Sequence, residues 1–539
     1  MVPTVRSAST QYLYPFARLS LAKAFSKSGF YFCLFLLLYM LTPTANYFWD
    51  GITFALQIEK VANQHTNFDL LFHQNHLLYN ALGYLVYYLV FAIGIKIKVL
   101  YLLQFINMII AACGVATLYS IIKPLTNNYI AAVTATFFGT TATWWKLSTD
   151  ADAYILSVVL LILCLKNLLG ELPNSVLSGI LFALAMLIHE LSSLFFFAGL
   201  AIIFTHPHIE KKLKFSLTFS TLSVGLTISV YYLVAITMHG ITSPGELIEW
   251  VTTNPSMITP ENNPIPGIWM TPNSNLRLIV GHSFKLFLAK STGLALGTAI
   301  ITGIVGIVLA AKMFQSSGLA GCWKIIRHFP KRLVGDERRL FIIITFWIIP
   351  YLIFLLFFEP MDENLRLFYL PAIALALALV LKPNQSQPAN SNATFPLRYK
   401  DLRVAALSVS LLALFNTAFF ILPNHHPEAN PLIAEARNTA AIWHKNAIIY
   451  FADREEVDTT FQYFNDQPLW KKMPKGSFAK IITEIDQAIL NGKEVWLNKG
   501  AIKDADQLFE HYESGDHLEV VADYAWGKYI RLIPKPLTP

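Results

Sequence analysis

The chain is poor in charged residues, and this shortage excludes an ordinary soluble protein. Only 14% of its 539 residues are charged, whereas 55% are hydrophobic. Soluble domains carry about 25% charged residues. Apolar runs of about 20 residues, which is the length needed to cross a bilayer, recur through residues 29–422. We therefore expect a polytopic membrane protein.

Cysteine is also scarce, which argues against a disulfide framework and a cysteine zinc site. Cys33, Cys113 and Cys164 lie in apolar runs, and Cys322 lies in a basic loop. No pair has the close spacing of metal ligands, so we interpret all four as small core residues. A cleavable signal peptide is not indicated either, because no small-residue cleavage pattern follows the first apolar run.

Positive charge is sparse outside a few loops. Residues 423–539 hold 13 Lys and Arg against 17 Asp and Glu, a net charge of −4. Because the whole chain has a net charge of +7, residues 1–422 have a net charge of +11. Cytoplasmic loops of membrane proteins carry an excess of Lys and Arg. This pattern predicts that the N-terminus and the other basic loops are cytoplasmic. The positive charge therefore reports the orientation of the chain in the membrane and is not evidence of nucleic-acid binding. The basic segments are residues 1–28, 206–214, 312–339 and 382–403.

The orientation constrains the number of crossings. Two cytoplasmic loops need an even number of spans between them, yet seven apolar runs separate the first two basic segments. We expect residues 77–97 not to cross, because their tyrosines and the final Ile-Lys-Ile-Lys favour the interface. The alternative is that they cross and that residues 175–205 form one bent helix. The runs are 29–47, 77–97, 99–122, 128–145, 153–170, 175–189 and 191–205.

The resulting fold class is an all-α polytopic membrane domain, residues 29–422, with about eleven transmembrane helices and outer loops at 48–98 and 239–280. Within the first loop, Phe54, Ile58 and Val61 share one helical stripe over residues 52–64. Such a helix is expected to lie in the membrane plane. The second loop contains tryptophans and prolines and could close over a substrate.

Residues 423–539 have a different character. Apolar strands are expected at Ala447–Phe451, Val495–Leu497 and Tyr529–Ile533, alternating with helices at Phe478–Leu490 and Asp504–His511. This pattern predicts a small soluble α/β domain on the extracytoplasmic side. The domain has no Gly-rich phosphate loop and no metal-ligand cluster, so accessory binding or assembly is its expected role.

Polar residues gather in the loops that the predicted topology places on the outer face. A carboxylate held beside lipid is costly, so by default it marks a functional site. Asp50 follows the first apolar run directly, and Asp150 and Asp152 lie between two spans. The remaining candidates are His73, His76, His189, Glu190, Glu363 and Arg366.

Each residue also has a structural interpretation. Asp50, Asp150 and Asp152 could cap helices, the histidines could be satisfied interfacial residues, and Arg366 could be an anchor that reaches the membrane surface. Three further charged residues, Glu59, Lys60 and Asp69, are expected to be solvated. The stronger evidence for a site is that the candidates share one face.

These residue types suit one reaction. A carboxylate at the membrane surface can take a proton from an acceptor hydroxyl, and a guanidinium pairs with phosphate oxygens. Together they suggest transfer from a lipid-linked phosphosugar, with the lipid tail between helices.

The order of these motifs resembles the GT-C superfamily of polyprenyl-phosphate-dependent glycosyltransferases, especially its protein O-mannosyltransferase-like and aminoarabinose-transferase-like branches. The shared order is an acid after the first span, a surface helix, His73-Gln-Asn-His76-Leu-Leu-Tyr79, and an acidic pair before a later span. Gly179–His189 and Arg366-Leu-Phe-Tyr-Leu-Pro371 also resemble family segments. This chain lacks the prolines usual near His76 and has Gly51 where the family often has a second acid.

The resemblance implies a catalytic acid at Asp50 and a second one at Asp150 or Asp152. Arg366, with His73 or His76, would hold the departing phosphate, and His189, Glu190 and Glu363 would contact substrate. The partners would be a polyprenyl-phosphate sugar donor, the bilayer, and a glycan, lipid or protein acceptor, with no nucleic acid.

The cofactor and the alternatives remain open at this stage. No close-spaced ligand set demands a cofactor, although Asp50 with His73 or His76 could hold a divalent metal. The expected location is the inner or plasma membrane, with the site on its extracytoplasmic face. The alternatives are a polysaccharide polymerase or ligase, a flippase for lipid-linked glycans, and a non-catalytic assembly protein.

Overall fold

The computed structural model describes residues 27–65, 67–252, 264–281, 335–382 and 399–532, the last range with short interruptions. These interruptions fall at 441, 445, 452–454, 466–468, 473–477, 499–511, 513–517 and 525–526. The predicted cytoplasmic segment 1–28 and the predicted helix Asp504–His511 therefore lie almost entirely outside the described residues.

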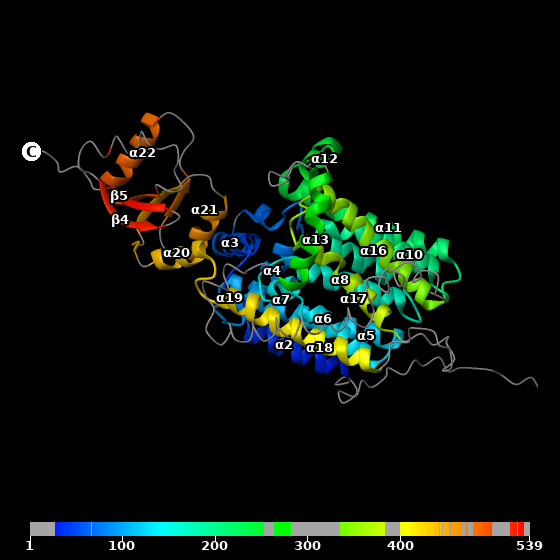
Figure 1. Ribbon diagram of the computed structural model, residues 1–539. Helices are drawn as coiled ribbons and strands as arrows, with labels where there is room; N and C mark the ends of the chain where they lie inside the picture. Colours follow the sequence, from blue (N-terminus) through cyan, green and yellow to red (C-terminus); the bar gives the residue numbers. More distant parts are fainter. Residues whose placement is uncertain are drawn as a thin grey trace, which may run out of the picture.

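Most of the described chain folds into a bundle of helices packed side by side (Figure 1). Helix α5 lies between α2, α6 and α8, while α9 joins α8 to α11, and α16 packs on α10 and α17. The bundle helices are α2 (Lys27–Leu41), α4 (Tyr79–Ala92), α5 (Val99–Leu125), α6 (Asn128–Thr140), α7 (Ala142–Ser148), α8 (Tyr154–Leu169), α9 (Ser175–Ile188), α10 (Phe196–Thr205), α11 (Lys212–His239), α16 (Asp336–Phe357), α17 (Leu370–Leu381) and α18 (Tyr399–Asn416).

Within the part of the chain that the structure describes, four helices are long and apolar enough to cross a membrane: Val99–Leu125, Lys212–His239, Asp336–Phe357 and Leu402–His425. Six shorter apolar helices pack with them, including α4, which has 14 residues and is about 21 Å long. The protein thus has the apolar helices of an integral membrane protein. The count of about eleven spans and the non-crossing of 77–97 stay predictions.

Buried aromatic hydrogen bonds fix α7 against α2. The indole of Trp144 donates to the hydroxyl of Tyr39 at 3.0 Å, and the indole of Trp145 donates to Thr42 at 2.9 Å. Both tryptophans are at most 1% exposed. Buried indole N–H groups usually find such partners. The pairs set the position of the loop that follows α7.

The amphipathic stripe near residue 54 forms α3 (Trp49–Gln64), which buries Ile52, Phe54, Ile58 and Val61. Asp50 lies in its first turn, where a negative charge is favourable beside the positive end of the helix. The helix ends at His65, whose backbone is left-handed, with φ 53°.

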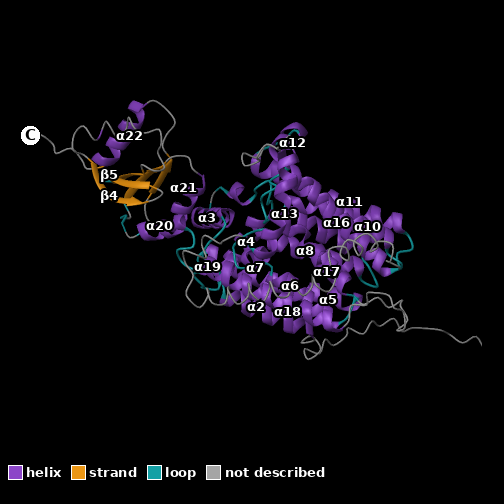
Figure 2. Cartoon of the chain, in the orientation of Figure 1, coloured by secondary structure: helices purple, strands orange, loops and turns teal. Residues whose placement is uncertain are grey.

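The C-terminal unit (residues 431–532) contains all the strands of the described chain (Figure 2). Its five-stranded sheet has the order β2-β1-β3-β5-β4, with β1 parallel to β2 and β3, and β5 antiparallel to β3 and β4. The elements are α20 (Pro431–Thr439), β1 (Ala447–Phe451), α21 (Glu455–Phe464), β2 (Leu469–Lys472), α22 (Phe478–Leu490), β3 (Glu494–Asn498), β4 (Leu518–Tyr524) and β5 (Gly527–Leu532).

The predicted strand Ala447–Phe451 and the predicted helix Phe478–Leu490 have the observed bounds. Strands β2 and β4 were not predicted, because short runs such as Leu-Trp-Lys-Lys carry little period-two signal. The loop expected at 239–280 is largely helical in its described part, as α12 (Pro244–Thr252) and α13 (Pro264–Val280).

Candidate active site

A tight loop between α7 and α8, residues 149–153, carries Asp150 and Asp152. Side chains of α5 hydrogen-bond to the backbone of this loop. The amide of Asn107 donates to the carbonyl oxygens of Asp150 at 2.9 Å and of Asp152 at 2.7 Å. One turn earlier, Gln104 donates to the carbonyl oxygens of Thr44 and Thr149 at 3.0 and 2.6 Å. Because α5 satisfies these buried carbonyls, the loop has a fixed shape.

Asp150 is fully buried and makes structural contacts. Its Oδ2 accepts from the backbone N–H of Phe48 at 2.9 Å and from Lys146 at 3.3 Å, and its Oδ1 accepts from Ala151 at 2.8 Å. Burial raises the pKa of Asp150, and the neighbouring Lys146 opposes that shift. Both carboxylate oxygens are therefore engaged, and Oδ2 joins this loop to the start of α3.

Asp152 has a different environment. It is fully buried, its Oδ1 accepts from the N–H of Ala153, and its Oδ2 has no hydrogen-bond partner among the described residues. Burial, and next the charge of Asp50, raise the pKa of Asp152 well above its usual range. Asp50, in the first turn of α3, and Asp152, in the α7–α8 loop, thus interact electrostatically.

A glycine permits this approach. A Cβ at position 51 would lie 2.6 Å from the carbonyl oxygen of Ala151. The backbone of α3 therefore contacts the 149–153 loop directly, between Asp50 and Asp152. The glycine at position 51 therefore has a steric reason.

A third acidic segment, residues 359–363, also lies near Tyr154. The carboxyl groups of Asp362, Asp152, Asp50 and Glu359 all interact electrostatically with the Tyr154 hydroxyl at the start of α8. Burial, with the nearby charges of Glu359 and Glu363, raises the pKa of Asp362 to about 7. Carboxyl groups from three distant parts of the sequence therefore lie near enough to one tyrosine to interact with it electrostatically.

Histidine rings lie next to Tyr154. The ring centres of His76 and His189 are 4.6 Å apart. The ring centre of His189 lies 4.8 Å from that of Tyr154 and 4.7 Å from that of Phe368. His73 lies 6.0 Å from His76 and forms an isolated β-bridge with it. Burial lowers the pKa of His76 to about 3 and also lowers the pKa of His73 and of His189. At neutral pH these rings are uncharged hydrogen-bonding groups.

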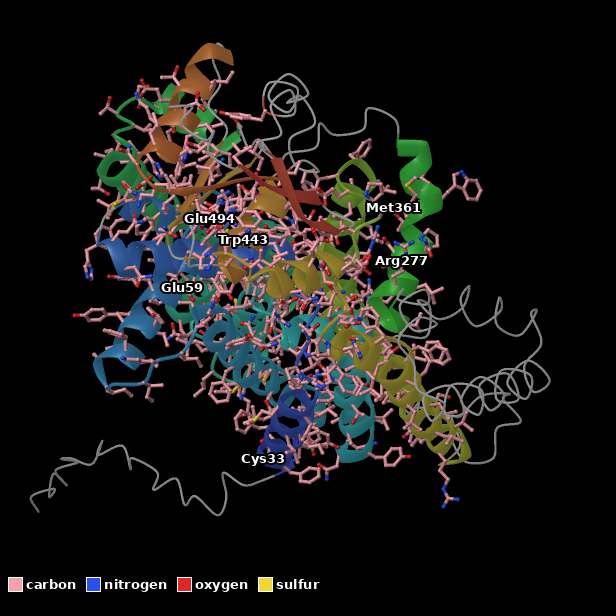
Figure 3. The ribbon with its side chains drawn as sticks, turned by 90° about the vertical axis from the view of Figure 1, so that its left-hand side faces the viewer. Cys33, Glu59, Arg277, Met361, Trp443 and Glu494 are labelled. Atoms are coloured by element: carbon pink, nitrogen blue, oxygen red, sulfur yellow. The ribbon has the colours of Figure 1, made fainter. Side chains whose placement is uncertain are left out.

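Arg366 is fully buried and braces the acidic segment. Its guanidinium donates to the Tyr369 hydroxyl at 3.0 Å, to the Pro360 carbonyl at 2.7 Å and to Thr271 of α13 at 3.4 Å. Among the described residues, its Nε has no hydrogen-bond partner and no carboxylate lies within salt-bridge distance of the guanidinium. An uncompensated buried charge is costly, so this position favours an anion. Figure 3 shows Met361 of this segment and Arg277 of α13 on the same side of the molecule.

The other predicted residues lie at the edges of this region. The backbone N–H of Glu190 donates to the carbonyl of Asn75 at 3.3 Å, which joins the two histidine segments. Glu363 accepts the Arg366 N–H through its carbonyl at 3.2 Å. Glu59, expected to be solvated, instead accepts the N–H of Val99 at 2.9 Å. Among the described residues, no three His, Cys, Asp or Glu side chains are arranged to hold a metal ion.

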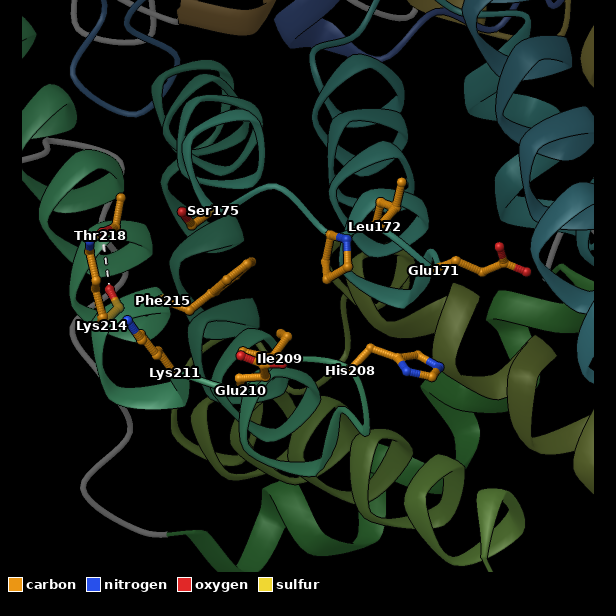
Figure 4. Close-up of a pocket in the computed structure, with 11 residues that line it drawn as sticks. Glu171, Leu172, Ser175, His208, Ile209, Glu210, Lys211, Lys214, Phe215 and Thr218 are labelled. Carbon is orange, nitrogen blue, oxygen red and sulfur yellow. Dashed lines mark hydrogen bonds between the residues drawn. The ribbon is translucent and has the colours of Figure 1, made fainter. Parts of the chain in front are cut away.

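A cavity of about 570 Å³ lies elsewhere, at the opposite ends of α8 and α9 (Figure 4). Lys211 and Lys214 line one wall, and Glu171 and His208 line the other. Helix α8 has 16 residues, so about 24 Å separates this cavity from Tyr154. The cavity is not where the acids meet.

Sequence patterns did not indicate Gln104, Asn107 or Tyr154. The two amides are single polar residues within a 27-residue apolar helix, and such isolated polar residues in a span were the available signal. Tyr154 directly follows the acidic pair, and its role is visible only when the three acidic segments come together.

Comparison with solved structures identifies the architecture. The structure of ArnT from Cupriavidus metallidurans bound to undecaprenyl phosphate covers 94% of this chain and 98% of its own, with a TM-score of 0.56 and 12% identity. The apo form of that ArnT covers 95% and 98%, with a TM-score of 0.58 and 11% identity. The chain therefore shares the fold of these ArnT structures.

The GT-C resemblance predicted from sequence is therefore confirmed for the fold. No protein-family model and no curated protein matches the sequence. The structural similarity to ArnT extends over nearly the whole of both chains, so it includes the C-terminal unit as well as the bundle.

Proposed function

We propose that the protein is an integral-membrane glycosyltransferase that moves a sugar from a polyprenyl-phosphate donor to an acceptor hydroxyl on the extracytoplasmic face. The observation that carries this proposal is the pair Asp50 and Asp152, which the Gly51–Ala151 contact brings together near Tyr154, with Asp152 buried and Asp50 half-buried. The GT-C fold and the undecaprenyl phosphate bound by ArnT support the donor class.

In this proposal Asp50 is the general base. It takes the proton of the acceptor hydroxyl while the acceptor oxygen bonds to the anomeric carbon and the bond from that carbon to the phosphate oxygen breaks. Asp152, with its raised pKa and unpartnered Oδ2, orients the acceptor or shares the proton. Attack from the face opposite the phosphate inverts the anomeric centre.

The buried Arg366 supplies positive charge for the donor phosphate, since no carboxylate of the described chain compensates it. His73, His76 and His189 are neutral and so contribute hydrogen bonds to sugar or phosphate oxygens rather than charge. Glu190 and Glu363 lie beside them as further substrate contacts. Asp150 is proposed to position Phe48 and the start of α3.

The proposal includes the finer topology predicted from sequence. About eleven helices cross the inner or plasma membrane, and the C-terminal unit is an extracytoplasmic α/β domain. The site then opens toward the outer leaflet, where a polyprenyl tail can lie between helices while its phosphate reaches Arg366.

Two measurements test this function. Native mass spectrometry of the purified protein should detect bound undecaprenyl phosphate, and Arg366→Gln should weaken that binding about tenfold or more, the loss expected for one charge-assisted pair. Lys214→Gln, at the distant cavity, is the matched control and should bind as the wild type does.

Membranes that contain the protein should also transfer label from a panel of undecaprenyl-phosphate hexoses and pentoses to endogenous acceptors. If the wild type neither binds undecaprenyl phosphate nor transfers any sugar of the panel, the proposed function is wrong.

A further inference from the structure

A buried polar contact joins the C-terminal unit to the helix bundle. Tyr463 of α21 is 2% exposed, and its hydroxyl donates to the carboxylate of Glu59 on α3 at 3.1 Å. The same hydroxyl accepts the backbone N–H of Leu100, in the first turn of α5, at 3.1 Å. Figure 3 shows Glu59 on the side of the molecule that carries the C-terminal unit, where Trp443 and Glu494 lie.

This contact also caps α5 from outside the helix. Lys98 at the N-cap position of α5 makes no capping hydrogen bond with its side chain. Instead Glu59 accepts the N–H of Val99 at 2.9 Å, and Tyr463 accepts the next N–H. Helix N-termini leave such N–H groups without intrahelical partners, and a carboxylate there is favoured by the helix dipole. The start of α5 therefore depends on both α3 and α21.

Further contacts surround this connection. Lys98 lies 5.2 Å from the centre of the Tyr463 ring, and Lys60 of α3 donates to Gln462 at 3.0 Å. The side chains of Tyr463 and Ile433 belong to the same apolar cluster as the buried face of α3. The C-terminal unit is thus packed against α3 by apolar as well as polar groups.

Helices α3 and α5 both position the acidic pair Asp50 and Asp152. Helix α3 carries Asp50 in its first turn, and α5 carries Asn107, which holds the carbonyls on either side of Ala151. A shift of α3 relative to α5 would therefore change the separation of Asp50 and Asp152. Tyr463 and Glu59 bind the two helices at one point and oppose that shift.

We infer that Tyr463 and Glu59 are positioning residues, and that the C-terminal unit is part of the active-site scaffold rather than a separate binding module. This inference rests on the proposed function for its kinetic consequence. Its structural consequence, the fixed shape of the 149–153 loop, is independent of any substrate.

The test compares two tyrosines of the same unit. Tyr463→Phe removes the contact with Glu59 and Leu100, while Tyr450→Phe removes a Tyr–Glu hydrogen bond of 3.2 Å to Glu484 inside the unit. Hydrogen exchange of the backbone amides at 149–154 is measured in both full-length variants. We expect faster exchange there in Tyr463→Phe and wild-type exchange in Tyr450→Phe.

A second series uses Glu59. Glu59→Ala should accelerate exchange at 149–154 as Tyr463→Phe does, whereas Glu59→Gln keeps an oxygen acceptor and should restore most of the protection. With the sugar donor that the wild type uses, Tyr463→Phe should lower kcat about tenfold or more and change KM less than twofold. A purely structural role in the C-terminal unit would not give this division.

Wild-type exchange at 149–154 in both Tyr463→Phe and Glu59→Ala would overturn the inference. Equal acceleration in Tyr450→Phe would do the same, because it would show general loosening of the unit. A wild type without transfer activity would contradict the proposed function alone, since the exchange comparison needs no donor.

Discussion

The backbone at Gly51 contacts the carbonyl oxygen of Ala151 so closely that a Cβ at position 51 would lie 2.6 Å from it. These two residues adjoin Asp50 on one side and Asp150 and Asp152 on the other. The spacing of the acidic pair therefore depends on a side chain that is absent.

Gly51→Ala should consequently separate the loops. We expect a loss of about 1 to 3 kcal/mol in stability, as for an overpacked core, together with at least a tenfold lower transfer rate. Gly225→Ala is the matched control, because a Cβ there meets nothing within 4 Å in the middle of α11. That change should leave activity intact and raise stability by up to about 1 kcal/mol. Thermal unfolding in detergent and sugar transfer measure the two effects, and equal behaviour of both variants would contradict the contact.

Asn107→Ala should release the 149–153 loop. It removes two hydrogen bonds to buried carbonyls, at a cost of about 1 to 3 kcal/mol, and should lower the transfer rate more than tenfold. Asn167→Ala also removes two amide hydrogen bonds, but at the other end of the bundle. We expect it to reduce thermal stability while the specific activity of folded protein is unchanged. Similar specific activities for the two alanine variants would show that the loop does not depend on Asn107.

Asp362 predicts a pH dependence of stability. Its pKa in the folded protein is raised to about 7, mainly by burial and next to that by Glu359 and Glu363. Between the pKa of Asp362 in the unfolded chain and pH 7, the folded state therefore binds more protons than the unfolded state. As the pH rises through that range, the contribution of Asp362 to the free energy of unfolding decreases. The Tm of Asp362→Asn should exceed that of the wild type by an amount that grows from pH 5 to 7 and is constant above.

Glu246→Gln serves as the control for Asp362. Backbone N–H groups of Ser243 and Thr242 lower the pKa of Glu246, so its contribution is complete above pH 5 and is lost only on stronger acidification. The Tm difference of this variant should be constant from pH 5 to 8. A Tm difference for Asp362→Asn that is also constant over that range would contradict the raised pKa.

The sequence allowed a mostly helical membrane fold to be predicted, and it favoured a shared face for the acids, for particular reasons. Asp50 and Asp152 each follow or precede an apolar run, so a shared face followed from topology alone, and the GT-C fold is confirmed by comparison. The strand Ala447–Phe451 was clear because a continuous apolar run is bounded by polar residues.

Other features depend on contacts between distant residues and could not be predicted. The backbone N–H of Phe48 binds Asp150, and Thr271 binds the buried Arg366, across about 100 residues of sequence. Only the three-dimensional structure therefore distinguishes structural side chains from those that could face a substrate. Glu59 was expected to be solvated because its helix face is polar, yet α21 covers it.

The most direct test of the account replaces Asp50 and Asp152 by asparagine, singly and together, with monodisperse folding as a condition. If they act as one unit, each single variant should lower transfer from the undecaprenyl-phosphate donor about 100-fold or more, and the double variant should be little worse than the slower single variant. Binding of undecaprenyl phosphate should stay close to that of the wild type in all three. Wild-type turnover in Asp50→Asn, or independent and multiplicative losses in the double variant, would contradict a shared carboxyl site.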